Sequence, residues 1–209
     1  MPTIDELLAA GHPRVVAILR GIAPDEARAV GSALIEAGIK IIEVPANSPR
    51  WQESVAALVE LAGDTALIGG GTITSPALAR DLAEAGGKLL VAPNCDPKVI
   101  AEGLAHAMDV MPGIMTPTEA LAATAAGARH LKLFPASSVP QGHLAAMLAV
   151  LPPTAGIWAV GGVDAGNAQS WLDAGARGIA AGSNLFRPGR DPALIGRDAE
   201  MLIASLRKA

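Results

Sequence analysis

The chain has 209 residues, of which 51% are hydrophobic and 17% are charged, and its formal net charge is −4. This composition excludes an intrinsically disordered protein, which would be poor in apolar residues and rich in charge. No run approaches the roughly 18 apolar residues that a membrane span needs, and the first residues do not resemble a secretory signal. A single cysteine, Cys95, fits a reducing compartment, and no Lys/Arg cluster suggests nucleic-acid binding. We therefore expect a cytoplasmic protein with neither a membrane nor a nucleic-acid partner.

Eight short apolar runs alternate along the chain with longer segments of helical pattern. Each run has four to six residues and is apolar almost throughout, as expected for strands buried on both faces of a parallel sheet. The predicted strands are 15–19, 39–44, 66–69, 88–92, 108–111, 130–134, 157–160 and 178–181.

Helix-start signals precede the segments between these runs. Ser, Thr or Asp can cap the free N–H groups of a first helical turn, and proline suits that turn because it needs no donor there. Such signals stand at 24–26, 48–49, 75–76, 96–97, 116–119 and Asp164. We also expect a short helix before the first strand.

An internal repeat supports the count of eight units. An Ala-Gly pair precedes every second predicted strand, with its glycine at Gly38, Gly86, Gly127 and Gly175, spaced by 48, 41 and 48 residues. Glycine in this place ends a helix in the left-handed conformation. We predict one domain over residues 1–209, an α/β fold that is a single (β/α)8 barrel. A doubly wound open sheet is the alternative, although no G-x-G-x-x-G follows the first strand.

Lys132 is one of only five lysines and the one that lies inside an apolar strand. Alternation along that strand places Leu131 and Leu133 toward the helices and Lys132 toward the barrel interior. Burial lowers the pKa of a lysine and makes it a nucleophile toward carbonyl groups. A structural lysine that pairs with a carboxylate across the barrel is the alternative.

Glu43 shares the parity of Ile41 and is also expected to face the interior. It could pair with Lys132 or Arg20, or act as a general acid and base, and the two roles can coexist. Arg20 ends the first strand, where a guanidinium can bind a carboxylate or phosphate. Thr72 follows three glycines that either allow a ligand close to the backbone or form a tight turn.

Glycine turns end the last two predicted strands. Barrels often bind phosphate with the loops after strands 7 and 8, through backbone N–H groups. Here these loops contain Gly161, Gly162, Gly182 and Ser183. The four histidines show no metal-ligand spacing, so we expect neither a metal nor a cofactor.

Taken in order, these segments resemble the 2-keto-3-deoxy-6-phosphogluconate and -galactonate aldolases. The resemblance is carried by Arg20-Gly, Glu43-Val-Pro-Ala-Asn-Ser-Pro, Gly69-Gly-Gly-Thr, Ala92-Pro-Asn, Met111-Pro-Gly, Leu131-Lys-Leu-Phe-Pro, Val160-Gly-Gly and Ala181-Gly-Ser. It implies a homotrimeric barrel that cleaves a phosphorylated 2-keto-3-deoxy sugar acid without metal.

The resemblance also implies a role for each site residue. It gives Lys132 the Schiff base and Glu43 the proton transfer. Arg20, Thr72 and Pro93 would hold the pyruvyl end of the substrate. The phosphate end would be held by Gly161, Gly162, Gly182 and Ser183.

Specificity is implied at Asn47, Val160 and Phe134. The gluconate branch usually has arginine where this chain has Asn47 and threonine where it has Val160, so both positions resemble the galactonate branch. We predict a class I aldolase that cleaves 2-dehydro-3-deoxy-6-phosphogalactonate reversibly to pyruvate and glyceraldehyde 3-phosphate. The alternatives are the gluconate epimer or both epimers as substrates, a phosphate-binding barrel isomerase or synthase, and a phosphosugar-binding protein without activity.

Overall fold

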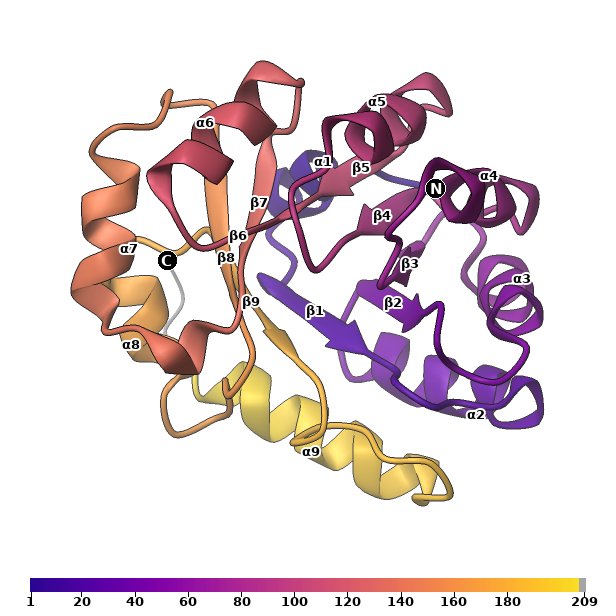
Figure 1. Cartoon of the computed structure of the whole chain (residues 1–209). Coiled ribbons are helices and arrows are strands. Elements are labelled where there is room, and N and C mark those ends of the chain that lie inside the picture. The colour runs from indigo at the N-terminus through magenta and orange to yellow at the C-terminus, as the bar shows by residue number, and fades with distance from the viewer. Residues whose placement is uncertain (207–209) are drawn as a thin grey trace.

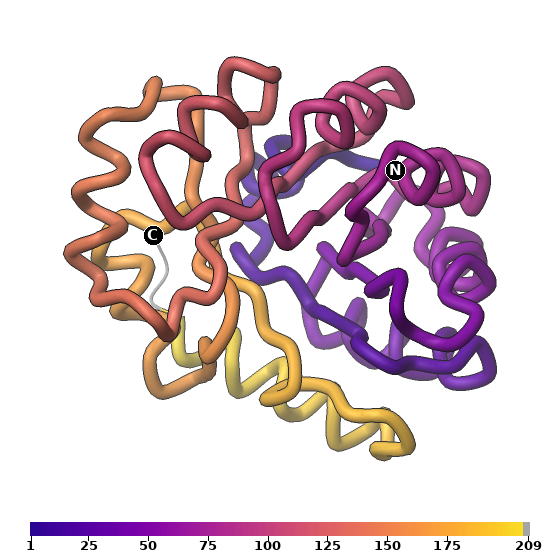
Figure 2. The backbone as a smooth tube through the Cα atoms, in the orientation of Figure 1, coloured from indigo at the N-terminus to yellow at the C-terminus, as the bar shows by residue number. Residues whose placement is uncertain are grey.

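The computed structural model describes residues 1–206, whose strands form one parallel sheet that curls into a barrel (Figure 1). Its strands are β1 (Val15–Ile18), β2 (Ile41–Pro45), β3 (Leu67–Gly71), β4 (Leu89–Val91), β5 (Asp109–Met111), β6 (Gly113–Ile114), β7 (His130–Leu133), β8 (Gly156–Val160) and β9 (Gly178–Ala181). All eight predicted strands are present. Strands β1 and β9, from opposite ends of the chain, pair side by side (Figure 2). The prediction of a (β/α)8 barrel is confirmed.

The fifth barrel strand differs from the prediction because it runs in two pieces. β5 pairs with β4 and β6 pairs with β7, so the two edges of the sheet are separated only by Pro112. Proline cannot donate to a strand ladder, which interrupts the pairing there. Its carbonyl still accepts the N–H of Lys132 at 2.8 Å. Although proline and glycine are typical of turns, residues 112–113 thus continue the strand and join the two halves of the ring.

Helices cover the outside of the barrel (Figure 1). They are α1 (Ile4–Ala9), α2 (Pro24–Glu36), α3 (Trp51–Ala62), α4 (Pro76–Glu84), α5 (Pro97–Ala105), α6 (Pro117–Ala125), the short 3₁₀ helix η1 (Ala136–Ser138), α7 (Gln141–Leu148), α8 (Ala168–Asp173) and α9 (Pro192–Ala204). Within residues 1–206, none of these helices has the length and apolar character that a bilayer crossing requires.

Two of the predicted helix starts are wrong. Helix α3 begins after Arg50 rather than at Ser48, whose buried hydroxyl instead accepts the N–H of Gly21 at 2.9 Å. Helix α8 begins after Asn167 rather than at Asp164, whose carboxylate accepts the N–H of Gly166 within the preceding turn. Ser48 thus joins the loops that follow β1 and β2, whereas Asp164 closes its own turn after β8.

The side chains of the strands alternate between two apolar regions. Leu131 and Leu133 join the large core between sheet and helices, whereas Ile41 belongs to a separate cluster inside the barrel. Trp158 also lies inside the barrel and is fully buried. This interior cluster fills the barrel between its strands.

Helix α1 closes the amino end of the barrel. Ile4 and Leu7 are buried in the interior cluster. Polar contacts fix the helix: the N–H of Ile4 donates to Asp109 at 2.6 Å, and Asp5 forms ion pairs with Arg129 and Arg177 at 2.9 and 2.5 Å. The site at the other end of the barrel is therefore sealed from below.

Candidate active site

Lys132 and Glu43 lie inside the barrel on strands β7 and β2. Both are buried, with exposed fractions of 4% and 1%. The predicted strand parity explains this placement, because their neighbours along each strand pack outward. An amine and a carboxylate held in a dry interior can act as a nucleophile and as an acid or base.

Burial shifts the two groups in opposite directions. Burial lowers the pKa of Lys132, partly opposed by the charge of Glu43, while the positive charge of Arg20 lowers it further. Burial raises the pKa of Glu43 to about 7, although the charges of Lys132 and Arg20 oppose the increase. Both shifts favour the uncharged forms, a neutral amine and a protonated carboxyl group.

The carboxylate of Glu43 packs against the backbone of Gly71 at the end of β3. A Cβ atom at position 71 would overlap all three atoms of the carboxylate group. Oxygen Oε2 of Glu43 is buried and has no hydrogen-bond partner among residues 1–206. Glycine at position 71 therefore provides the space for this carboxylate, and a hydroxyl group or water of the substrate complex can donate to it.

We expect Gly71→Ala to lower kcat by about 100-fold, because the methyl group displaces the Glu43 carboxylate and proton transfer contributes about 10²- to 10⁴-fold. Steady-state kinetics on the purified variant measure the loss. Gly142→Ala is the matched control, since a Cβ at Gly142 meets nothing within 4 Å. Equal rates for the Gly71 variant and the native protein would show that catalysis does not require the Glu43 carboxylate to occupy the space beside Gly71.

Arg20 lies just beyond the end of β1, and its guanidinium is held by a side chain from the next strand loop. Its Nη1 donates to Oδ1 of Asn47 at 2.8 Å. Both residues are exposed at the carboxyl end of the barrel, and the charge of Arg20 reaches both Lys132 and Glu43. The structure thus brings Lys132, Glu43 and Arg20 together. It links Asn47 to them through Arg20.

Phe134 connects Lys132 to the loop after β8. Its ring centroid is 4.6 Å from the amine of Lys132. A Cβ at Gly161 would lie 3.3 Å from the same ring. The aromatic ring is therefore close to both the amine and the predicted phosphate loop.

The loop after β8 has the conformation that glycine permits. Gly161 and Gly162 have φ of 96° and 73°, in the region that other residues rarely adopt. The loop is braced from two sides, because Ser137 donates its N–H to the carbonyl of Gly161 at 3.1 Å and Asn167 donates its side-chain amide to the carbonyl of Gly162 at 2.8 Å. Sequence reasoning missed these two bracing residues, which no local pattern marks.

The remaining predicted residues lie at the same end of the barrel. Thr72 is half-buried with φ of 58°, a strained conformation for a β-branched residue and one often found at functional sites. Pro93 is half-buried beyond β4, and Val160 is buried in the interior cluster at the end of β8. Gly182 and Ser183 follow β9 directly, where Gly182 accepts N–H groups from Leu185 and Phe186.

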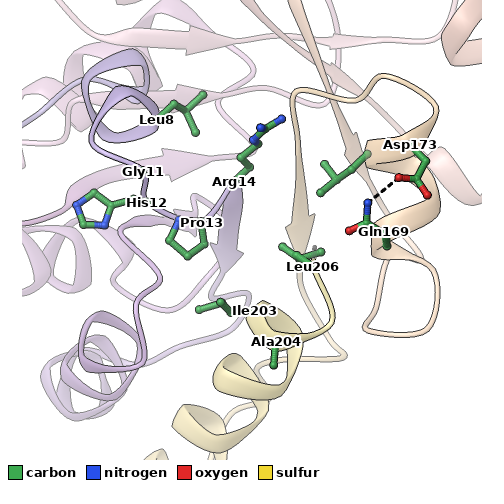
Figure 3. Close-up of a pocket in the computed structure, with 11 residues that line it drawn as sticks. Leu8, Gly11, His12, Pro13, Arg14, Gln169, Asp173, Ile203, Ala204 and Leu206 are labelled. Carbon is green, nitrogen blue, oxygen red and sulfur yellow. Dashed lines mark hydrogen bonds between the residues drawn. The ribbon is translucent and has the colours of Figure 1, made fainter. Parts of the chain in front are cut away.

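A cavity of about 1100 Å³ lies away from this site, at the amino end of the barrel (Figure 3). It is lined by the end of α1, the segment before β1, helix α8 and the last turns of α9. Its position beyond the amino ends of the strands separates it from Lys132 and Glu43. Among the side chains of residues 1–206, no group of three His, Cys, Asp or Glu residues comes together to hold a metal.

Comparison with known proteins agrees with this arrangement. The family model "KDPG and KHG aldolase" matches residues 4–191. The chain is 43% identical to the 2-dehydro-3-deoxy-6-phosphogalactonate aldolase of Escherichia coli K12, over 93% of this chain and 95% of the relative.

Two solved structures have nearly the same fold. One is named "Native KDPGal structure", with 42% identity, a TM-score of 0.89 and coverage of 91% of this chain and 93% of that chain. The other is a designed cage made by fusing symmetric oligomeric domains, with 42% identity, a TM-score of 0.90 and coverage of 92% and 72%. The resemblance seen in the sequence is confirmed: the chain belongs to the KDPG and KHG aldolase family.

Proposed function

We propose that the protein is a class I aldolase that cleaves 2-dehydro-3-deoxy-6-phosphogalactonate reversibly to pyruvate and glyceraldehyde 3-phosphate. The observation that carries the proposal is the buried pair of Lys132, with a lowered pKa, and Glu43, with a raised one. A neutral amine and a carboxyl group that titrates near pH 7 are the two groups that Schiff-base chemistry needs. Membership in an aldolase family supports the same reaction type.

The reaction begins when the amine of Lys132 attacks the C2 ketone of the substrate. Glu43 protonates the departing hydroxyl of the carbinolamine, so that water leaves and an iminium forms. Glu43, now ionised, accepts the proton of the C4 hydroxyl through a water molecule. The C3–C4 bond then breaks, its electron pair moves into the enamine, and glyceraldehyde 3-phosphate leaves.

The second half of the reaction returns the enzyme to its starting state. Glu43 returns the proton to C3 of the enamine, which regenerates the iminium. Water adds to the iminium and transfers one proton to Glu43, which is then protonated again, and the carbinolamine collapses to release pyruvate and the free amine of Lys132. No electrons are gained or lost in the cycle, and each proton taken up by Glu43 is given back.

Substrate binding is divided between two groups of residues. Arg20, Thr72 and Pro93 hold the carboxylate and the pyruvyl carbons. The loops with Gly161, Gly162, Gly182 and Ser183 hold the phosphate through their backbone N–H groups. Phosphate held away from the reacting bond orients that bond over Lys132 through binding energy.

The galactonate epimer is favoured by Asn47 and Val160. Neither side chain offers the guanidinium or hydroxyl group that is usual in the gluconate branch, and a changed set of polar contacts can discriminate strongly between epimers. The relatives with 43% and 46% identity carry names that refer to the phosphogalactonate, the second as a probable function. We place Phe134 with these two residues, because its ring borders both Lys132 and the phosphate loop.

The test compares kcat/KM for the two phosphorylated epimers and for the galactonate sugar acid without phosphate. We expect the galacto epimer to be cleaved with the higher kcat/KM, and removal of the phosphate to raise KM. A clear preference for the gluco epimer would assign the enzyme to that substrate instead. Cleavage that does not depend on phosphate would contradict the assignment of the glycine loops.

Assembly and location complete the proposal. We infer that the protein is a homotrimer in the cytoplasm, since the resemblance implies a trimer and a structural neighbour was built from symmetric oligomeric domains. Light scattering measures the mass of the assembly, and a monomer in solution would contradict this inference.

A further inference from the structure

The side chain that anchors Arg20 carries no charge. Among residues 1–206, no carboxylate oxygen lies within 4.0 Å of its guanidinium, and the partner that holds it is the neutral side-chain oxygen of Asn47 at 2.8 Å. A carboxylate in the same place would neutralise the guanidinium and compete with an anionic substrate. The amide oxygen fixes the position of the side chain and leaves its positive charge and remaining donors available.

Hydrogen bonds hold the turn that carries Asn47 on both sides. The N–H of Ala46 donates to the carbonyl of Gly71 at 2.7 Å, which ties the turn to the end of β3. On the other side, the hydroxyl of Ser48 accepts the N–H of Gly21 at 2.9 Å, and Ser48 is 6% exposed. The residue before Asn47 and the residue after it are thus fastened to two neighbouring barrel segments, one of which follows Arg20 directly.

Arg20 acts in turn on the reacting groups. Its positive charge lowers the pKa of both Lys132 and Glu43, and these two are the charged groups that interact with each other inside the barrel. A guanidinium free to swing into solvent would exert less of this effect, because charges separated by water are screened. The position of Arg20 therefore matters for the amine as well as for a substrate carboxylate.

We propose that Asn47 is a positioning residue that holds Arg20, still fully charged, where it captures the carboxylate of the 2-keto acid beside Lys132. This inference rests on the proposed function and adds to it a role for Asn47 that is independent of the C4 configuration. Asn47 acts through Arg20, so its effect extends to a ligand that has no C4 hydroxyl.

Pyruvate is the probe that separates these roles, because it carries the carboxylate and the ketone but no C4 hydroxyl. Borohydride reduction traps the pyruvyl adduct on Lys132, and mass spectrometry measures its yield against pyruvate concentration. We expect Asn47→Ala to raise the half-saturating pyruvate concentration about tenfold, as for a lost hydrogen bond to a charged group. Gln52→Ala, an exposed amide on α3, is the control and should match the native protein.

Asn47→Asp keeps the shape and the acceptor but adds the negative charge. We expect a larger rise in half-saturating pyruvate than for the alanine variant, because the aspartate neutralises Arg20. The added charge also stabilises the ammonium form of Lys132, so the pH at which trapping reaches half its maximum should move upward. A variant that only lost a structural contact would not shift this pH.

A double-mutant cycle with Arg20→Ala tests the route of action. If Asn47 acts through Arg20, then adding Asn47→Ala to Arg20→Ala changes the pyruvate dependence no further. Equal effects of Asn47→Ala with and without Arg20, or a native pyruvate dependence in Asn47→Ala, would overturn the inference. Failure of the native protein to form any adduct would instead overturn the proposed function on which it rests.

Discussion

Lys132→Met is expected to abolish both cleavage and the trapping of pyruvate. Methionine keeps most of the length of the side chain inside the barrel but has no amine, so no Schiff base forms. We expect kcat to fall by at least about 10⁴-fold, as for removal of a catalytic nucleophile. Mass spectrometry after borohydride reduction should find a single pyruvyl adduct on native Lys132 and none in the variant.

Lys98→Met is the matched control for this change. Lys98 is exposed near the start of α5, so its removal should alter neither rate nor trapping. Retained cleavage in the Lys132 variant would contradict the Schiff-base mechanism. It would favour a barrel isomerase or synthase in which Lys132 and Glu43 only stabilise the fold.

Glu43→Gln is expected to lower kcat by about 10²- to 10⁴-fold, because glutamine fills the same space but cannot transfer a proton. In the native enzyme, the pKa of Glu43 of about 7 should appear as a limb of the pH profile near neutrality. That limb should be missing from the residual activity of the variant. Native kcat in the variant would remove Glu43 from the proposed proton transfers.

Glu43→Gln should also change the free energy of unfolding, in a direction set by the raised pKa of Glu43. The folded-state pKa of Glu43 lies above its ordinary value of 4.5, so the stability that its protonation contributes is fully present below pH 4.5 and is lost as pH rises through about 7. This pKa shift corresponds to a change of about 3 kcal/mol in the free energy of unfolding. Glu43→Gln should therefore gain stability relative to the native protein between pH 4.5 and pH 8, as measured by denaturant unfolding. A difference in unfolding free energy that does not change with pH would contradict the raised pKa.

Strand patterns predict the barrel and the placement of its central pair well. The alternation around Lys132 and Glu43 is a local property, since neighbouring apolar residues must pack under helices. The split of the fifth strand was missed because proline and glycine at 112–113 also favour a turn, and only pairing with β7 decides the outcome.

Contacts between distant segments could not be predicted in this way. Ser48 was expected to cap a helix, but its hydroxyl is used by Gly21, 27 residues earlier in the chain. The bond between Arg20 and Asn47 spans the same separation. The N–H of Ser137 also bonds to a separate loop, because it donates to the carbonyl of Gly161 after β8.

Helix α1 gives the barrel a direction for the exchange of water. Ile4 and Leu7 fill the amino end, so the interior that holds Lys132 and Glu43 exchanges water with the solvent through the carboxyl end. In the proposed reaction, the water released when the iminium forms and the water that later hydrolyses it would both pass through this opening. Substrate and water would therefore share one entrance, and the hydrolytic water would enter after the aldehyde has left.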